Sequence, residues 1–261
     1  MEKINKLKKF LRSKKIDGYI VPKNDEYFGE YITNHKDRLK FISDFTGSFG
    51  FALILNNNNY LFVDGRYTLQ AIKQSGKFFK IKTIPRDLPK YILKNKSLKI
   101  GFDPKLFTKK SLNIFFGKTD CKYIPLDKNL IDKIWIRKTN AFKNKFYSMP
   151  LNSVGESYKL KVKKIVSKLK KSGADFQFIT ASENNAWLMN IRGNDSQYTP
   201  IPHSHMLIDK KKNIKLFCDL KKISTSFKKR FNKIEFINIE NTDEILSKIY
   251  RKKINIDENT C

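Results

Sequence analysis

The two halves of this chain follow one plan, and that internal repeat constrains the fold more than any single motif does. Each half opens with a Lys-rich amphipathic helix that passes through Gly and Asp into a strand, at residues 15–20 and again at 172–177. Each half then runs through an acidic turn and a short helix into a hairpin with a Lys- or Asn-rich turn. The order helix, strand, helix, hairpin, helix, strand occurs twice and predicts two related domains.

Hydrophobic periodicity places the elements of the first half. Apolar residues three and four apart predict helices, and apolar runs bounded by Gly, Asn or Asp predict buried strands. The helix over 66–75 is predicted from the apolar residues Leu69 and Ile72 and is expected to stop at Gly76. The asparagines 56–59 are expected to turn a hairpin. The predicted helices are 2–15, a stretch through 39–45, 66–75, 88–94 and 109–116, and the predicted strands are 19–22, 51–55, 60–63, 78–84, 98–102 and 121–125.

The second half shows the same alternation. Its predicted helices are 158–171, 183–190 and 242–250, and its predicted strands are 175–179, 205–208, 214–218, 234–239 and 254–256. Strands that alternate with helices around apolar runs are typical of the α/β class.

The alternation of predicted helices and strands stops between residues 127 and 157, where Trp135 is followed by a Lys- and Asn-rich stretch. This stretch is interpreted as an inter-domain linker, which gives domains 1–150 and 151–261. The second copy of the plan stops after the strand at 254–256. We therefore expect the second domain to be incomplete at its C-terminus and the chain to be truncated.

The net charge of +29 invites a nucleic-acid interpretation. Specific readers of nucleic acids cluster their cations and rely on Arg for bidentate contacts, whereas only eight of the 54 basic residues are Arg and the Lys are spread along the chain. Lys, Asn and Ile share A/T-rich codons, so a genome-composition bias accounts for the excess. No specific nucleic-acid partner is expected.

The remaining composition indicates a folded protein in a reducing compartment. Twenty-one Phe and eleven Tyr suffice for a core, and no apolar run reaches the roughly 18 residues of a membrane span. The three cysteines are far apart and odd in number, which excludes a disulfide framework. We expect Cys121 and Cys218 to be core thiols, a cytoplasmic location and no membrane partner.

Motifs for catalysis and metal binding are missing from the sequence. The chain has no GxSxG, HExxH, phosphate loop or GxGxxG. His203 and His205 form a His-x-His pair, but no third and fourth ligand lies nearby in the sequence. Asp195 is not assigned as a metal ligand either. The prediction is therefore no catalytic residue and no metal ligand in this chain.

Two segments remain as candidates for binding. Asp64-Gly65-Arg66-Tyr67 follows a buried strand and opens a helix, a place where side chains project from the end of a sheet. Arg66 could bind a carboxylate or a peptide carbonyl, or Asp64 could simply cap the helix beside a solvated Arg66. Segment 187–193 is either core plus turn or a Trp/Arg surface, and core is favoured for Trp187 and Leu188.

Several short motifs, in this order and at this spacing, resemble the N-terminal part of the Xaa-Pro aminopeptidases (aminopeptidase P) of the creatinase/prolidase superfamily. The resemblance runs from about residue 5 to the end of the chain. It rests on residues 20–22 (Ile-Val-Pro), 30–32 (Glu-Tyr-Ile), 41–48 (Phe-Ile-Ser-Asp-Phe-Thr-Gly-Ser), 62–67 (Phe-Val-Asp-Gly-Arg-Tyr), 130–135 (Leu-Ile-Asp-Lys-Ile-Trp) and 186–195 (Ala-Trp-Leu-Met-Asn-Ile-Arg-Gly-Asn-Asp).

The resemblance implies two related α/β domains, each a mixed β-sheet flanked by helices. In the family a third domain carries two Asp, one His and two Glu on a dinuclear metal centre, usually manganese, whose activated water attacks the carbonyl before a penultimate proline. This chain lacks that domain, so we expect no cofactor in it and two divalent metals, Mn, only in the full-length enzyme. The family arginine that contacts the bound peptide matches Arg66.

The function that follows is the non-catalytic N-terminal region of a Xaa-Pro aminopeptidase, inactive alone. Within the full enzyme it would shape substrate access and oligomer contacts, with peptides that carry proline at position two as substrates and a homo-oligomer as the assembly. The alternative is a stand-alone creatinase-like module that binds peptides or proteins without hydrolase activity.

Overall fold

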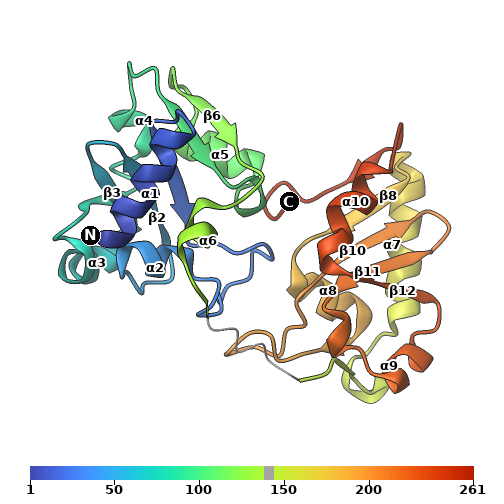
Figure 1. Ribbon diagram of the computed structural model, residues 1–261. Helices are drawn as coiled ribbons and strands as arrows, with labels where there is room; N and C mark the ends of the chain where they lie inside the picture. The colour runs from blue at the N-terminus through green and yellow to red at the C-terminus, as the bar shows by residue number, and fades with distance from the viewer. Residues whose placement is uncertain (138–143) are drawn as a thin grey trace. The chain divides into compact units, whose positions relative to one another are not determined.

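Two multi-stranded sheets, each flanked by helices, organise the chain (Figure 1). The computed structural model describes residues 1–137 and 144–261. Contacts between Cα atoms divide the chain into unit 1, Met1–Asp25 with Asn34–Thr139, and unit 2, Glu26–Thr33 with Asn140–Cys261. The predicted domain limits 1–150 and 151–261 stay a prediction, and residues 138–143 of the predicted linker lie outside the described residues.

Unit 1 holds a six-stranded sheet of order β4-β3-β2-β1-β5-β6. Strands β1, β2 and β3 are antiparallel neighbours, whereas β3–β4, β1–β5 and β5–β6 are parallel pairs. The elements are α1 (Glu2–Ser13), β1 (Gly18–Pro22), α2 (Arg38–Ser43), β2 (Gly50–Leu55), β3 (Asn59–Asp64), η1 (Gly65–Tyr67), α3 (Thr68–Ser75), β4 (Lys80–Ile84), α4 (Pro89–Ile92), β5 (Lys99–Phe102), η2 (Pro104–Leu106), α5 (Lys109–Phe116), β6 (Lys122–Pro125) and α6 (Leu130–Ile134).

The core of unit 1 lies on both faces of the sheet. Successive side chains of a strand point to opposite faces, and β1 shows this directly. Tyr19 and Val21 join one apolar cluster with Leu7 and Leu11 of α1, whereas Ile20 joins the cluster on the other face. A strand that is covered on both faces has a continuous run of apolar residues. This run explains why the sequence predicts the strand.

Unit 2 holds a five-stranded sheet of order β12-β11-β10-β8-β13 and a two-stranded pair, β7 with β9. The second core cluster packs helices α7 and α8 on the larger sheet. The elements are β7 (Tyr147–Ser148), η3 (Leu151–Ser153), α7 (Tyr158–Ser172), β8 (Phe176–Ile179), α8 (Ser182–Met189), β9 (Ile191–Arg192), β10 (Ser204–Asp209), β11 (Ile214–Cys218), η4 (Leu220–Lys222), α9 (Thr225–Arg230), β12 (Ile234–Asn238), η5 (Ile239–Asn241), α10 (Thr242–Ser247) and β13 (Ile254–Asn255).

The predicted repeat is present in the strand pairings. The pairs β8–β10 and β10–β11 are antiparallel and β11–β12 and β8–β13 are parallel, as in their unit 1 counterparts. Each unit also has a pair of hydrogen bonds between an Asp and a Lys, which we call the clamp. The Asp17 N–H donates to the Lys99 carbonyl at 2.7 Å, and the Asp17 carboxylate accepts the Lys99 N–H at 2.8 Å. Asp175 and Lys253 form the same two bonds at 2.8 and 3.1 Å.

Helix α6 lies inside the stretch that was predicted to be linker, so that part of the prediction is wrong. Leu130 and Ile131 are fully buried in the core of unit 1, and the Asn129 side chain caps the helix by accepting the Ile131 N–H at 2.9 Å. A helix of five residues offers too few turns for a periodic signal. The sequence analysis also missed α9, which has six residues.

Helix α3 packs through its small residues and not through the apolar pair Leu69 and Ile72 that indicated a helix in the sequence. Leu69 is 83% exposed and Ile72 is more than half exposed, while Ala71 and Ser75 are buried. The Ser75 hydroxyl donates to the Ser43 carbonyl at 2.7 Å. Small residues face the core because they let the helix lie close to its neighbours. None of the helices in 1–137 and 144–261 is long and apolar enough to cross a bilayer.

Replacement of Ile131 by Ala tests the burial of α6. We expect Ile131→Ala to lower the free energy of unfolding of unit 1 by about 2–5 kcal/mol, because the lost side chain leaves a cavity in the core. Urea unfolding followed by Trp135 fluorescence in a Trp187→Phe background measures it. The matched control is Ile136→Ala, whose side chain is 97% exposed. Equal effects of the two changes would contradict the burial of α6.

Candidate functional site

The turn that carries Arg66 begins where β3 ends. Asp64 has extended backbone and caps the 3-10 turn η1, because its carboxylate accepts the Arg66 N–H at 2.9 Å. The same oxygen accepts the Arg66 side-chain Nε–H at 2.9 Å. One carboxylate oxygen therefore fixes both the backbone and the side chain of Arg66, so the capping interpretation of Asp64 is correct and does not exclude a role for the arginine.

The guanidinium of Arg66 is presented to solvent. The side chain is 73% exposed, and among the described residues Nη1 and Nη2 have no hydrogen-bond partner. Its central carbon lies 5.4 Å from the centre of the Tyr67 ring. These terminal nitrogens can donate to a carbonyl or a carboxylate, which is the chemistry of a peptide backbone.

Tyr67 is held by residues of the segment that precedes β2. Its hydroxyl lies 2.7 Å from the Ser48 hydroxyl, and its ring meets Phe45 edge to face at 6.0 Å. Gly50 directs the chain from this turn into β2 with a φ of +156°, and a Cβ there would lie 2.6 Å from the Phe62 carbonyl oxygen. The Gly-rich turn at 47–50 thus supports the ring beside Arg66.

The hydrogen bond between Asp64 and Arg66 shifts the pKa of both side chains. It holds the pKa of the Asp64 carboxyl below its ordinary value and raises the pKa of the Arg66 guanidinium. A charged acceptor and a charged donor favour each other's ionised form. Both groups therefore stay charged over the physiological range.

Unit 2 has the same carboxylate cap after a strand, but a lysine stands at the position of Arg66. Asp219 follows β11 and accepts the Lys221 N–H at 3.0 Å, as Asp64 accepts the Arg66 N–H. The capped turn is therefore a structural feature of both units, and the fixed guanidinium is specific to unit 1. Lys carries a single flexible ammonium and cannot reproduce the bidentate geometry of Arg.

The His-x-His pair lies beside a segment from the first half of the sequence. Tyr27, which belongs to unit 2, stacks on His203 with ring centres 4.2 Å apart and tilts over His205 at 5.3 Å. The ring nitrogen Nε2 of His205 lies 3.1 Å from the Glu26 carbonyl oxygen. Across 1–137 and 144–261 no group of three or more His, Cys, Asp or Glu residues is placed to hold a metal ion.

Asp195 has a structural role in unit 2. Its side chain is almost fully buried, forms an ion pair with Lys222 and accepts the His203 N–H at 2.8 Å. Burying a carboxylate is costly unless it is paired and hydrogen-bonded, and these bonds meet that need.

The cysteine thiols differ in their surroundings. Cys218 is fully buried, and burial raises its pKa to about 12, so it is a core thiol as predicted. Cys121 is only partly buried and its thiol donates to the Lys96 carbonyl at 3.1 Å.

The structure corrects the prediction for Trp187. Leu188 is buried as expected, but Trp187 is 61% exposed. Lys161 lies on its inner side, with its ammonium 4.1 Å from the ring centre and 2.7 Å from the Trp187 carbonyl oxygen. Sequence reasoning also missed the contact of Tyr27 with the histidines, since it joins residues far apart in the chain.

Comparison with protein families matches both units. A model described as the creatinase/prolidase N-terminal domain matches residues 3–134, and a second model with the same description matches residues 137–261. The two matches lie one after the other, as the internal repeat requires.

Relatives of known name are similar along most of the chain. Xaa-Pro aminopeptidase 1 of Dictyostelium discoideum is 31% identical over 246 residues, which cover 87% of this chain and 39% of the relative. Aminopeptidase P1 of Lotus japonicus is 32% identical and covers 82% of this chain and 33% of the relative. The chain therefore spans only about a third to two fifths of these relatives.

A solved structure shares the fold. The X-prolyl aminopeptidase of Caenorhabditis elegans, described as a cytosolic enzyme with a di-nuclear active site, superposes with a TM-score of 0.87. The match covers 94% of this chain and 43% of that chain at 24% identity.

The lowered pKa of Asp64 leads to a pH prediction. A depressed pKa means that the pairing stabilises the turn fully above the ordinary carboxyl pKa and that this stabilisation is lost as the pH falls through the lowered pKa. Titration of the Asp64 carboxyl by ¹³C NMR should give a value below that of an ordinary Asp. In Arg66→Ala the pKa should rise toward the ordinary range but stay below it, because the backbone N–H of residue 66 still donates to the carboxylate. An unchanged pKa would contradict the side-chain pairing.

Proposed function

This chain belongs to the creatinase/prolidase N-terminal domain family, and from that premise we propose that it serves as the non-catalytic N-terminal region of a Xaa-Pro aminopeptidase. The full enzyme would remove the N-terminal residue that precedes a proline. The observation that carries the proposal is the similarity of 87% of the chain to a Xaa-Pro aminopeptidase of which it spans 39%.

The metal chemistry of such an enzyme lies outside the described residues. A dinuclear centre needs several carboxylate or imidazole ligands around one point, and no such group exists in 1–137 or 144–261. The described residues therefore do not fit the two divalent ions that the family implies, and we assign them no step in the metal chemistry.

Arg66 is the residue through which this chain would reach the substrate. Its terminal nitrogens are presented to solvent while Asp64 fixes the start of the guanidinium. A guanidinium held in this way loses less side-chain freedom when it donates to a peptide carbonyl. In this proposal unit 1 shapes substrate access and Arg66 binds the peptide.

The setting of the enzyme is part of the same proposal. We propose a cytoplasmic location, peptides with proline at position two as substrates, and a homo-oligomeric full-length enzyme to whose contacts these two units contribute. The C. elegans protein of the same fold is described as cytosolic, which supports the location.

The first test is peptidase activity of the chain alone. The purified chain is mixed with Mn²⁺ and an Arg-Pro-Pro peptide, and the released N-terminal residue is measured. We expect no release above the metal-only background, because the described residues hold no site for two ions. A full-length family member assayed in parallel is the positive control. Turnover at the rate of that control would overturn the non-catalytic role.

The second test addresses Arg66 in the full-length enzyme. We expect Arg66→Ala to raise KM about ten- to hundredfold with a smaller change in kcat, because one charge-assisted hydrogen bond to the peptide contributes about 1.5–3 kcal/mol. Lys221→Ala is the matched control, since Lys221 occupies the same capped turn in unit 2. If KM and kcat stay unchanged in Arg66→Ala, Arg66 is only a solvated residue.

A further inference from the structure

The start of α7 forms one wall of a groove in unit 2 whose charged lining residues are all lysines. The groove has a volume of about 340 Å³ and lies between α7, the turn that joins β10 to β11, and the start of β12. We call it the lysine groove. Its four lysines, all with exposed side chains, are Lys159, Lys163, Lys212 and Lys233. Like charges gathered around one hollow repel each other and together attract an anion.

Acidic side chains near the groove are engaged elsewhere. Glu156 pairs with Lys164 at 2.7 Å. Glu235 pairs with Lys215 on β11. Asp209 accepts three N–H groups inside the hairpin turn. Across residues 1–137 and 144–261 no carboxylate forms an ion pair with a lysine of the groove, so the charge of these lysines is left for a ligand.

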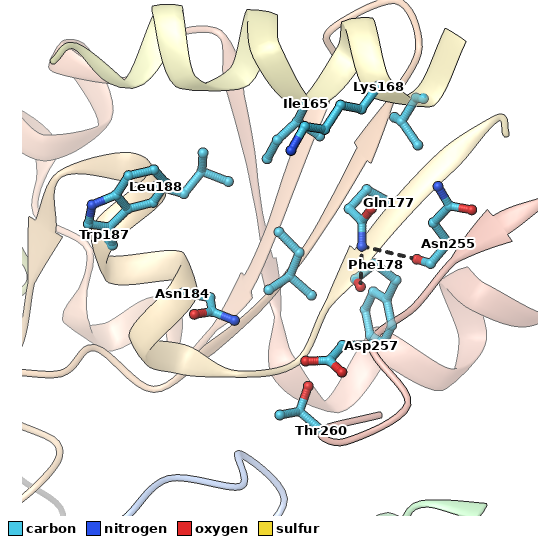
Figure 2. A pocket seen from close by; sticks show the side chains of 12 residues that line it. Ile165, Lys168, Gln177, Phe178, Asn184, Trp187, Leu188, Asn255, Asp257 and Thr260 are labelled. Carbon is cyan, nitrogen blue, oxygen red and sulfur yellow. Dashed lines mark hydrogen bonds between the residues drawn. The ribbon is translucent and has the colours of Figure 1, made fainter. Parts of the chain in front are cut away.

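A second cavity of unit 2 has a different balance of charge. Figure 2 shows it between α7, α8 and β8, with Lys168 and Asp257 among the side chains that line it. A base and an acid therefore face that cavity, which gives it no preference for one sign of charge. The charged residues of the lysine groove are lysines only, so charge complementarity specifies an acidic occupant.

The floor of the lysine groove is apolar. Val162, Ile214 and Ile234 line it and are buried in the core of unit 2. Leu160 also lines the groove, and 52% of its surface is exposed. An exposed aliphatic side chain among lysines suits a ligand that carries an apolar group between its negative charges.

A nucleic acid would suit this lining poorly. Single strands bind through aromatic side chains on which the bases stack, and phosphates are held best by the fork of an arginine. Among the described residues that line the groove there is no arginine, and the one tyrosine, Tyr158, packs on Phe231 with ring centres 5.3 Å apart. A polypeptide supplies what the groove requires, because Asp or Glu can flank a Leu, Ile or Phe within one short segment.

A phenylalanine stands in unit 1 where the groove of unit 2 has Lys233. β3 and β11 each start with the first pair after the hairpin turn. The parallel partner of their second residue is Lys80 in unit 1 and Glu235 in unit 2, and Phe78 and Lys233 lie two residues before these partners. Phe78 packs on the core of unit 1, and asparagines 56–59 stand in place of the lysine turn. The groove is therefore open and basic in unit 2 because of exchanges inside the described chain.

Lys212 occupies a backbone position that favours glycine. It is the last residue of the turn 210–212, its φ is 73°, and its N–H donates to the Asp209 carbonyl at 3.0 Å. Turns of this kind usually have Gly at the left-handed position, because a Cβ is strained there. Strained residues gather at binding sites. A lysine at this position costs stability and brings a further ammonium to the groove, which is a second indication of a ligand.

We propose that the lysine groove binds an acidic segment of another polypeptide, in which a bulky apolar side chain lies between carboxylates. The apolar side chain would pack on Leu160 and the buried floor. Carboxylates on one side of it would pair with Lys159 and Lys163 of α7, and those on the other side with Lys212 and Lys233. The proposal rests on the residues of unit 2 and does not depend on the proposed function.

The test titrates the ¹⁵N-labelled full chain with three synthetic peptides in about 150 mM salt. The probe is acetyl-Ser-Glu-Glu-Leu-Glu-Glu-Ser-amide. One control peptide has Ser in place of the Leu, and the other has Gln in place of each Glu. We expect saturable NMR shifts of the backbone amides of 158–163, 211–214 and 233–235. The probe should bind about tenfold more tightly than the Ser peptide, because its leucine is buried on the groove floor, and the Gln peptide should not saturate.

Two variants of equal net charge separate the groove from the general attraction of a basic chain. Lys163→Glu with Lys212→Glu reverses two lysines of the groove. Lys170→Glu with Lys211→Glu is the matched control, since it changes one exposed lysine of the same helix and one of the same turn, both outside the groove. We expect the first variant to weaken probe binding about tenfold, at about threefold for each exposed ion pair. The control should stay within about twofold of the unchanged chain.

Lys212→Gly separates binding from folding. Gly adopts a φ of 73° without strain, so this variant should melt at a temperature no lower than that of the unchanged chain. It should nevertheless bind the probe about threefold more weakly, because one ion pair is lost. This variant carries the test if the charge reversals perturb the fold. Unchanged affinity in Lys212→Gly would limit Lys212 to the turn and contradict its role in the groove.

Three further results would overturn the proposal. The first is no saturable shift at millimolar probe. The second is an equal loss of affinity in the two charge variants, which would make the binding an effect of net charge alone. The third is displacement of the probe from the groove amides by polyuridine or by phosphatidylserine vesicles at concentrations below the Kd of the probe, which would assign the groove to a nucleic acid or a membrane surface.

Discussion

The pairing of the first strand of each unit with two different partners is the constraint on which the rest of the structure depends. β1 pairs antiparallel with β2 on one side and parallel with β5 on the other, and β8 does the same with β10 and β13. The Asp17 and Asp175 clamps fix the register of the parallel pair. Because a slip of one residue would turn every side chain to the other face, these clamps also determine which residues reach each core.

The turn that carries Arg66 follows β3, and β3 is placed in the sheet by its pairing with β2, which pairs with β1. β3 ends at Asp64, one residue after Val63 pairs with Gly50 at the start of β2. The Ser48 hydroxyl, in the turn before β2, lies 2.7 Å from the Tyr67 hydroxyl. Unit 2 has the same strand end and the same Asx cap at Asp219 but a lysine where unit 1 has Arg66. Duplication of a domain thus preserved the backbone of the turn, while the side chain suited to a peptide carbonyl is found in one copy.

Helix α6 closes one side of unit 1. It packs on α1 and α2 and removes a buried arginine, a tyrosine and an aspartate from solvent. In unit 2 a cavity between α7, α8, β8 and the segment after β13 is lined by side chains that include Lys168, Asn184 and Trp187.

The sequence by itself determined the alternation of elements, the two hairpins and the family. These features depend on neighbours in the chain, since a buried strand is a local apolar run, and α5 has the predicted bounds, Lys109–Phe116. The local pattern also placed Arg66 in a turn at the end of a strand, where the structure has it.

Only the tertiary structure decided which apolar residues are buried and which polar residues meet. Ile131 is in the core and Ile136 is in solvent although they are five residues apart, and Trp187 is exposed although its sequence neighbour Leu188 is buried. The clamp joins residues 82 positions apart and the contact of His205 with Glu26 joins residues 179 positions apart. Such contacts depend on how strands and helices pack in space, and a pattern along the chain carries no information about that packing.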